Sequence, residues 1–173
     1  MATAAAAINL TSGLKAERKL EMLFVNTGSG ETKAWELLGR GVEDASIDFG
    51  HETKQTTDIL GITDTEVGPA KPNIELDPNT VRGGQKLSEM ILDIERRNAI
   101  AELSQFEILD VHCYLGTAAG PYTAELHTGC TIVPKSLGGS TYVGLPLTVY
   151  LSNEKTLGTV TIAAGVPTFT ATT

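Results

Sequence analysis

The chain has 173 residues, 41% of them hydrophobic, which supports one substantial core and leaves little length for a second domain. Its formal net charge of -8 disfavours tight nucleic-acid binding by phosphate neutralisation, because such binding needs clustered Lys and Arg. Two cysteines are too few for a disulfide scaffold, and no apolar run is long enough to span a bilayer, so neither a secreted disulfide protein nor membrane insertion is expected.

Residues 1 to 18 are expected to form an N-terminal arm, and residues 19 to 173 a single domain. The arm combines an Ala-rich start with Thr11-Ser12-Gly13 and a small basic cluster. Such a composition is typical of a segment that orders against a partner or stays mobile. We therefore place the arm outside the core.

The first predicted strand runs from Leu20 to Asn26 and is followed by the turn-forming residues 27 to 31. A second strand from Trp35 to Leu38 returns along it. The two segments therefore predict a β-hairpin at the start of the domain.

Residues 43 to 62 are predicted to form a long β-hairpin. In its first strand, Ala45, Ile47 and Phe49 alternate with polar residues, which indicates a half-buried strand. We place the turn at residues 50 to 53 and the second strand at residues 54 to 62. An isolated two-stranded ribbon is only marginally stable in water, so this hairpin needs a partner. The candidate inter-subunit contacts on it are Asp48, Glu52, Lys54, Gln55, Asp58 and Ile59.

Residues 63 to 73 are interpreted as a loop leading into the short segment 74 to 76. The only strong helix is predicted at residues 84–97, from Gly84 to Arg97, because apolar residues recur there at helical spacing. These residues are Leu87, Met90, Ile91 and Ile94. The helix either continues to Leu103 or breaks at Asn98.

The remainder of the chain is predicted to be β-structure. The expected strands are residues 106–115, 122–133, 142–151, 158–162 and 166–170. The first of these is apolar on both faces, which favours a central position, whereas Pro167 favours a sheet edge. The predicted fold is mainly β: a β-sandwich or open barrel of two antiparallel sheets with one flanking α-helix.

Neither catalytic nor cofactor-binding nor metal-binding residues are predicted. His112 is adjacent to Cys113, and His127 lies three residues before Cys130, so each pair is expected to point to opposite faces of a strand. Nucleophile-elbow, Walker and dinucleotide-binding motifs are not found in the sequence. The paired carboxylates at residues 43–44 and 64–66 lie on polar segments. We therefore expect no enzyme activity and no cofactor.

The long hairpin, the arm and the sheet edges predict self-association. Unpaired backbone N–H and C=O groups at a sheet edge bind readily to another chain. Strand addition from subunit to subunit would close these edges around a symmetric ring.

The order of the segments resembles that of the phage major tail tube proteins, a family found in tailed phages and phage-derived tails. The similarity lies in Trp35-Glu36-Leu37-Leu38-Gly39, in the stretch 52–61 that ends in Asp58-Ile59-Leu60-Gly61, in the helix after Asp77-Pro78, and in the terminal Gly158-Thr159-Val160-Thr161. It implies a structural virion protein whose hexameric rings stack into the tail tube and conduct DNA during ejection. By the same analogy, the hairpin and the arm would make the contacts between rings.

The resemblance also implies partners and a location. The partners are copies of the chain itself, with a tape-measure protein, a tail terminator and a baseplate hub protein, and genomic DNA would pass through without specific binding. The protein would be assembled in the host cytoplasm and reside in the virion tail. A negative wall would repel phosphate, which gives the acidic balance a reason. The alternatives are another virion component, such as a head-tail connector or decoration protein, and a small ligand-binding β-sandwich.

Overall fold

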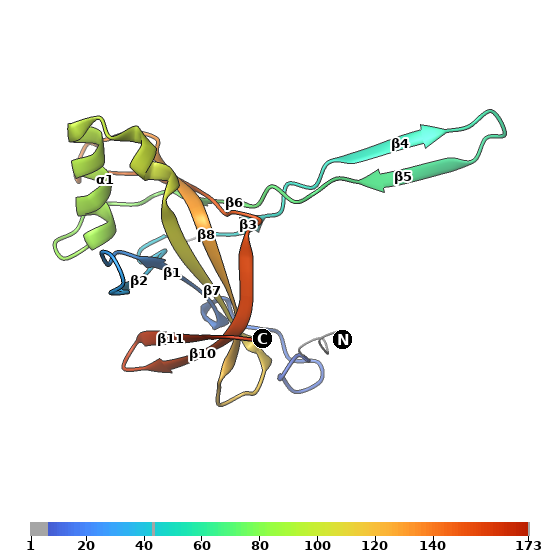
Figure 1. Cartoon of the computed structure of the whole chain (residues 1–173), viewed down its shortest axis with the longest axis horizontal. Coiled ribbons are helices and arrows are strands. Elements are labelled where there is room, and N and C mark those ends of the chain that lie inside the picture. The colour runs from blue at the N-terminus through green and yellow to red at the C-terminus, as the bar shows by residue number, and fades with distance from the viewer. Residues whose placement is uncertain (1–6, 43, 173) are drawn as a thin grey trace.

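A computed structural model describes residues 7–42 and 44–172. The fold is mainly β, as predicted: a curled antiparallel sheet forms a half-barrel, a second small sheet stands apart from it, and one helix packs against the half-barrel (Figure 1). The large sheet has the strand order β2 (Trp35–Leu37), β1 (Glu21–Asn26), β7 (Phe106–Gly116), β8 (Tyr122–Pro134), β9 (Leu147–Tyr150), β6 (Asn73–Leu76) and β3 (Ile47–Asp48). The strands β10 (Lys155–Ala163) and β11 (Val166–Ala171) branch from β8, and the small sheet consists of β4 (Thr53–Thr57) and β5 (Thr63–Val67).

The predicted N-terminal hairpin is confirmed. After the 3-10 turn η1 (Arg18–Leu20), β1 (Glu21–Asn26) pairs with β2 (Trp35–Leu37) on one side and with β7 on the other. The side chains at the centre of β1 are buried. This strand therefore lies inside the sheet, and β2 forms its edge.

The predicted hairpin at residues 43 to 62 is wrong in its boundaries. Its first strand shrinks to β3 (Ile47–Asp48), which pairs with β6 (Asn73–Leu76) instead of with the following strand. The hairpin is formed by β4 (Thr53–Thr57) and β5 (Thr63–Val67), so part of the predicted loop 63–73 is a strand. Residue 43 lies outside the described residues.

The turn of this hairpin lies at Asp58–Ile62 because the sequence there has the chemistry of a tight turn. The Gly61 N–H donates to the Asp58 carbonyl at 3.1 Å, and the Asp58 N–H donates to the Ile62 carbonyl at 2.9 Å. Gly61 has a φ of 82°, a left-handed conformation that suits glycine. Asp at the first position and Gly at the fourth are the preferred residues of a type I turn, and the αL glycine fits a three-residue hairpin loop.

The predicted helix is confirmed as α1 (Lys86–Arg97), whose apolar stripe buries Leu87, Ile91 and Ile94. It ends where Asn98 adopts a left-handed conformation with φ of 55°. The 3-10 helix η2 (Ile100–Ser104) follows. Of the two alternatives for the end of the helix, the break at Asn98 is therefore the correct one.

β7 (Phe106–Gly116) is the central strand, as predicted, and pairs with β1 and with β8 (Tyr122–Pro134). Its alternate residues enter two different cores. Ile108 belongs to the core beneath the helix, whereas Leu109 and Val111 belong to the core on the opposite face. Apolar residues on both faces are what a strand covered on both sides requires.

A bulge in β8 makes the sheet branch. The register shifts between Phe106↔Cys130 and Ile108↔His127, which leaves one extra residue on β8 beside Gly129, whose φ is 70°. Beyond the bulge, β8 pairs with β9 (Leu147–Tyr150), and before it with β10 (Lys155–Ala163). The predicted strand 142–151 is shorter than expected because residues 142–146 do not join the ladder.

The C-terminal hairpin is confirmed. β10 pairs with β11 (Val166–Ala171) across the turn at Ala164 and Gly165, where both φ angles are positive. β11 pairs only with β10, so Pro167 lies on an edge strand, as its missing N–H requires.

Part of the N-terminal arm is attached to the subunit's own sheet. The Asn9 N–H donates to the Tyr114 carbonyl at 3.0 Å, its side-chain amide donates to the Cys113 carbonyl at 3.1 Å, and Ile8 bridges Leu115. The sequence predicts an arm that orders against a partner or stays mobile, but residues 7–9 instead bond to β7 of the same subunit. Residues 1–6 lie outside the described residues. Within the described part of the chain, no helix has the length and hydropathy needed to cross a membrane.

Candidate assembly surface

The β4–β5 hairpin, residues 53–67, is called the ribbon here. Every residue of its two strands is exposed, and the ribbon projects away from the half-barrel (Figure 1). Its base is held by a hydrogen bond from the Gly68 N–H to the Glu52 carbonyl at 2.7 Å and by an ion pair between Lys71 and Glu52. The ribbon therefore offers both of its faces to a partner.

The two faces of the ribbon differ in charge. Cross-strand partners share a face, and successive residues alternate between faces. One face carries only uncharged side chains, namely Thr53, Gln55, Thr57, Thr63, Thr65 and Val67. The other face carries Lys54 opposite Glu66, and Thr56 opposite Asp64. The uncharged face can be buried against a partner without desolvating a charge.

The tip of the ribbon is apolar. Ile59, Leu60 and Ile62 are 102%, 78% and 58% exposed, respectively. The Asp58 carboxylate shapes this tip by accepting the backbone N–H groups of Leu60 at 2.8 Å and Ile62 at 2.9 Å. Large apolar side chains gathered on an exposed turn are typical of a surface that contacts another protein.

The ribbon also has unused backbone donors along its outer edge. Hydrogen-bonded pairs alternate with non-hydrogen-bonded pairs in an antiparallel ladder. The hydrogen bonds at Asp58–Ile62 and Gly68–Glu52 place Thr56 and Lys54 in the hydrogen-bonded pairs. The N–H of Gln55 therefore points away from β5, toward the outer edge.

The structure brings together four of the six candidate contact residues. Lys54 and Gln55 lie on β4, and Asp58 and Ile59 form the turn. Glu52 lies at the base of the ribbon. Asp48 is on β3, outside the ribbon, where its carboxylate accepts the Gly50 N–H at 2.9 Å.

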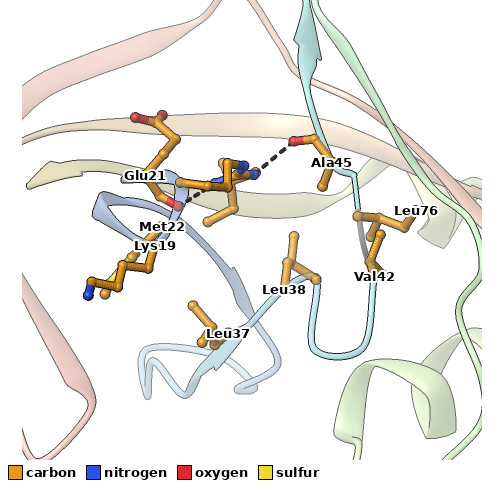
Figure 2. Close-up of a pocket in the computed structure, with 11 residues that line it drawn as sticks. Lys19, Glu21, Met22, Leu37, Leu38, Val42, Ala45 and Leu76 are labelled. Atoms are coloured by element: carbon orange, nitrogen blue, oxygen red, sulfur yellow. Dashed lines mark hydrogen bonds between the residues drawn. The ribbon is translucent and has the colours of Figure 1, made fainter. Parts of the chain in front are cut away.

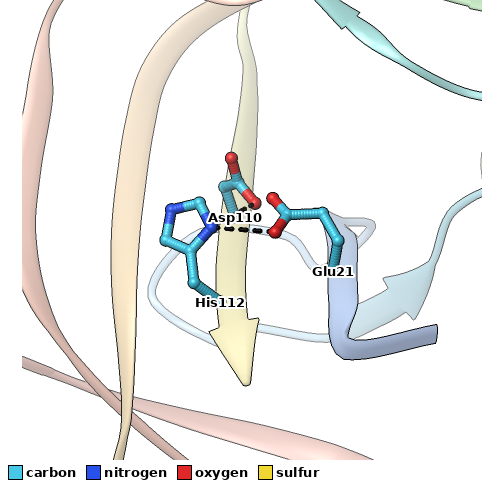
Figure 3. A group of neighbouring side chains, drawn as sticks. All are labelled: Glu21, Asp110 and His112. Atoms are coloured by element: carbon cyan, nitrogen blue, oxygen red, sulfur yellow. Dashed lines mark hydrogen bonds and ion pairs between the residues drawn. The ribbon is translucent and has the colours of Figure 1, made fainter. Parts of the chain in front are cut away.

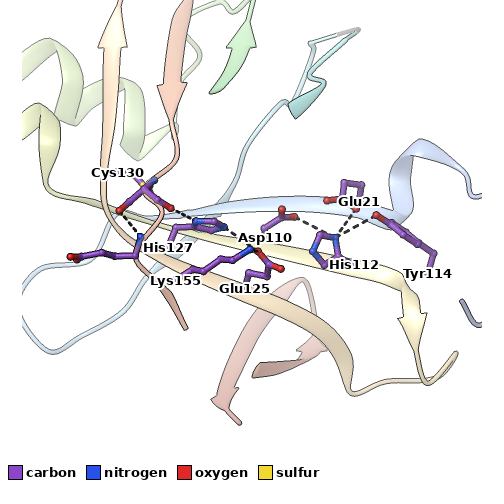
Figure 4. Close-up of polar contacts among 10 residues, drawn as sticks. Glu21, Asp110, His112, Tyr114, Glu125, His127, Cys130 and Lys155 are labelled. Atoms are coloured by element: carbon purple, nitrogen blue, oxygen red, sulfur yellow. Dashed lines mark hydrogen bonds and ion pairs between the residues drawn. The ribbon is translucent and has the colours of Figure 1, made fainter. Parts of the chain in front are cut away.

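A row of polar side chains continues the helix-facing side of the sheet beyond the apolar core (Figure 4). It comes from β1, β7, β8 and β10, and its labelled members are Glu21, Asp110, His112, Tyr114, Glu125, His127 and Lys155. Asp110 and His127 are 4% exposed. Buried polar groups in the middle of a β-sheet require partners, so each contact in this row matters.

Glu21, Asp110 and His112 form one end of the row (Figure 3). The His112 Nδ1 lies 3.0 Å from the Glu21 Oε2 and 3.9 Å from the Asp110 Oδ1. Burial, together with the Glu21 carboxylate, raises the pKa of Asp110 to about 8. Burial opposes the ionisation of Glu21, but the hydrogen bond with His112 holds the pKa of Glu21 below its ordinary value. The ionisation of each of the three groups therefore depends on the other two.

Glu125, His127 and Lys155 form the other end. The Lys155 Nζ donates to the Glu125 carboxylate at 2.7 Å, and the His127 Nε2 lies 3.6 Å from the same oxygen. The nearby His127 ring, and also the hydrogen bond from Lys155, lower the pKa of Glu125 to about 2 despite its partial burial. The negative charge of Glu125 is therefore stabilised by Lys155 and His127.

The prediction that each His/Cys pair points to opposite faces of a strand is correct for one pair and wrong for the other. Cys113 belongs to the core opposite the helix, whereas His112 is in the polar row, so this pair does point to opposite faces. His127 and Cys130 do not, because the extra residue at the bulge restores both to one face. There the His127 Nδ1 donates to the Ser152 carbonyl at 2.7 Å, and the Ser152 N–H donates to the Cys130 Sγ at 3.5 Å.

A hollow of about 350 Å³ lies between the start of β1 and the loop before β3 (Figure 2). Its wall is largely apolar, with Met22, Leu38 and Val42 among the labelled residues. The Arg18 guanidinium in it is engaged by the backbone, donating to the Glu21 carbonyl at 2.7 Å and the Ala45 carbonyl at 2.9 Å. Among the described residues that line this hollow, polar groups do not converge as they do in a ligand-binding β-sandwich.

Comparison with known proteins gives a likeness in fold. No family model matches the chain, and no curated protein matches its sequence. A solved chain from the sheath/tube terminator of the extracellular contractile injection system PVC, in the extended state, is 13% identical, with 85% of this chain and 99% of that chain covered at a TM-score of 0.50.

Two further solved chains are more distant in structure. One is from the PVC sheath-tube complex in the extended state, at 15% identity, coverage of 86% and 95%, and a TM-score of 0.47. The other is the anti-feeding prophage cap, described as the AFP tube terminating cap, at 18% identity, coverage of 92% and 99%, and a TM-score of 0.46. At such low identities a likeness concerns the fold alone, and here it concerns the fold of the terminator chain, whose TM-score is 0.50.

Proposed function

We propose that this chain is a structural subunit of a phage-tail-like particle, and that its copies assemble into stacked hexameric rings that form a tail tube. The ribbon carries this proposal: its strands are exposed on both faces, one face is uncharged and the tip is apolar. A two-stranded ribbon of this kind is marginally stable in water by itself. The fold likeness to a sheath/tube terminator supports the same class of assembly.

The partner that fits the ribbon best is a second copy of this chain. The outer edge of β4 offers unused N–H groups, and the same subunit presents edge strands β2 and β11 with unpaired ladder groups. The outer edge of β4 in one subunit can therefore pair with an edge strand of a neighbouring subunit. When such a contact between two different surfaces is repeated from subunit to subunit, it produces rings or stacks.

The location and the partners that we propose follow from a role in a tail tube. A tube in a virion tail, assembled in the host cytoplasm, would hold a tape-measure protein and meet a tail terminator and a baseplate hub protein at its ends. DNA would pass without specific binding, which suits 21 acidic against 13 basic residues. The proposal assigns the chain no enzymatic reaction.

A second candidate function is that of a terminator or cap at the end of a tube. The likeness to the PVC sheath/tube terminator favours it, since that chain is covered over 99% of its length. A terminator would form single rings that do not stack.

Negative-stain microscopy and light scattering of the purified chain test both functions. Long hollow tubes support the tube subunit, single rings support the terminator, and a stable monomer at all concentrations contradicts both. A matched variant replaces residues 53–67 by a short Gly linker, because the Glu52 carbonyl and the Gly68 N–H already lie 2.7 Å apart. This variant should retain the cooperative unfolding transition of the half-barrel and fail to assemble.

A further inference from the structure

Two neighbouring strands bring three potential metal ligands to one place. Asp110 and His112 are two residues apart on β7 and therefore share a face. Glu21 on β1 is the direct cross-strand partner of His112. One ligand atom from each of the three side chains lies within 4.8 Å of the other two.

The Asp110 carboxylate points into this group with an oxygen that has no hydrogen-bond partner. Its side chain is 5% exposed, and among residues 7–42 and 44–172 nothing bonds to its Oδ1. Figure 3 shows this carboxylate directed at the His112 ring, beside the Glu21 carboxylate. A buried carboxylate oxygen without a partner calls for a bound ion or another explanation.

The basic side chains of Lys155 and Arg18 are engaged elsewhere: Lys155 is bonded to Glu125, and Arg18 donates to two backbone carbonyls. The carboxyl groups of Glu21 and Asp110 remain together with the His112 imidazole. Burial favours a proton on the Asp110 carboxyl when no ion is bound, and a divalent cation would displace this proton.

We propose that Glu21, Asp110 and His112 bind a divalent first-row transition-metal ion of the Zn²⁺ or Mn²⁺ class. The set of two carboxylate oxygens and one imidazole nitrogen suits these ions, whereas Mg²⁺ and Ca²⁺ prefer oxygen ligands alone. Ligand bonds of about 2.0–2.1 Å in a tetrahedral site separate the ligand atoms by about 3.3 Å. The observed separations of 3.0 Å and 3.9 Å from the His112 Nδ1 lie on either side of this value.

Solvent can supply the remaining ligands. The side chains of Glu21 and His112 are 18% and 15% exposed, so one side of the group is open to water. The ion would tie the start of β1 to β7, next to the point where Asn9 of the arm bonds to the Tyr114 carbonyl. The site would therefore hold the N-terminal segment against the sheet, whether or not the subunits assemble.

Calorimetric titration of the full chain, treated first with a chelator, tests the proposal with ZnCl₂ and MnCl₂ as separate probes and MgCl₂ for comparison. We expect one saturable Zn²⁺ or Mn²⁺ site per chain and an upward shift of the melting temperature on binding. Asp110→Asn should weaken binding by at least about tenfold, since loss of even an outer-shell partner has effects of that size. Glu66→Gln, a carboxylate loss on the ribbon, and His51→Ala, also away from the site, should leave binding unchanged.

A spectroscopic measurement on the unaltered chain keeps the test independent of whether a variant folds. Bound Mn²⁺ should show nitrogen hyperfine coupling in pulsed electron paramagnetic resonance, and His112→Gln should remove it. The proposal is overturned if neither metal binds saturably to the native chain, if bound Mn²⁺ shows no nitrogen coupling, or if folded Asp110→Asn binds as tightly as the native chain. In those cases the three groups would share a proton instead of an ion.

Discussion

The Asp58 carboxylate accepts a hydrogen bond from the backbone N–H of Ile62 at 2.9 Å, across the loop that presents the apolar tip of the ribbon. The same oxygen accepts the Leu60 N–H at 2.8 Å. One side chain thus orders a loop in which residues 58–62 are all exposed.

Asp58→Ala should therefore loosen the tip while leaving the half-barrel intact. Loss of these bonds should speed amide hydrogen exchange at Ile62 by about fivefold, a conservative value for bonds to an exposed charged acceptor. Asp58→Asn keeps an acceptor oxygen and should restore most of the protection. Equal exchange rates in all three proteins would show that the turn does not depend on this side chain.

The sequence carries a signal for this turn, yet its apolar pattern predicts the hairpin one segment too early. Gly50 and the apolar alternation at Ala45, Ile47 and Phe49 favour a turn at 50–53. Gly50 does adopt a positive φ, but it closes no hairpin, and Phe49 is 61% exposed. Asp58 and Gly61 at turn positions one and four were the better signal. A fully exposed ribbon lacks the burial pattern on which strand prediction depends.

Gln55→Pro should block assembly without disturbing the ribbon itself. Its N–H lies on the outer edge of β4, so proline removes a donor available only to a neighbouring chain. Thr56→Pro is the matched control, because the Thr56 N–H lies on the side facing β5 and its loss should disrupt the ribbon. Electron microscopy should show no tubes for Gln55→Pro, and amide exchange should show an intact ribbon. Normal tubes would rule out strand addition at this edge.

Thr65→Asp should prevent assembly, whereas Thr56→Lys, which places a charge opposite Asp64 on the charged face, should be tolerated. Both residues are exposed threonines of the ribbon, but Thr65 lies on the uncharged face and Thr56 on the face with Lys54 and Glu66. Burial of a new unpaired carboxylate at Thr65 would cost several kcal/mol in the assembly. Sedimentation would measure the polymer fraction. Equal polymerisation of the two variants would mean that the uncharged face stays open to water.

The polar row was less accessible to sequence reasoning than the fold. Asp110 and His112 stand out as polar residues at alternate positions of an apolar strand, and this pattern could have marked them as neighbours on one face. The contribution of Glu21 depends on the pairing of β1 with β7, which joins segments about 90 residues apart. The shared face of His127 and Cys130 depends on the bulge at Gly129, which strict alternation cannot anticipate.

Ile91→Asp should destabilise the subunit itself and not only its assembly. Ile91 is fully buried in the core between α1 and the sheet, and an aspartate there would lose packing and bury an unpaired charge. We expect a loss of about 3–5 kcal/mol in the free energy of unfolding. Glu95→Ala, on the exposed side of the same helix, should change it by no more than about 0.5 kcal/mol. Denaturant unfolding of both variants measures the difference.

Glu125 should make the subunit less stable in acid. Because the pKa of Glu125 is lowered to about 2 in the folded chain, its ionised form stabilises the fold above the unfolded-state pKa of about 4.3, and this contribution declines as the pH falls toward 2. Between pH of about 6 and about 3, the native chain should lose about 1–2 kcal/mol that Glu125→Gln does not lose. Denaturant unfolding at both pH values, in the Thr65→Asp background to keep the chain monomeric, gives this difference directly. Parallel pH profiles for the two proteins would show that the contacts of Glu125 with His127 and Lys155 do not stabilise the fold.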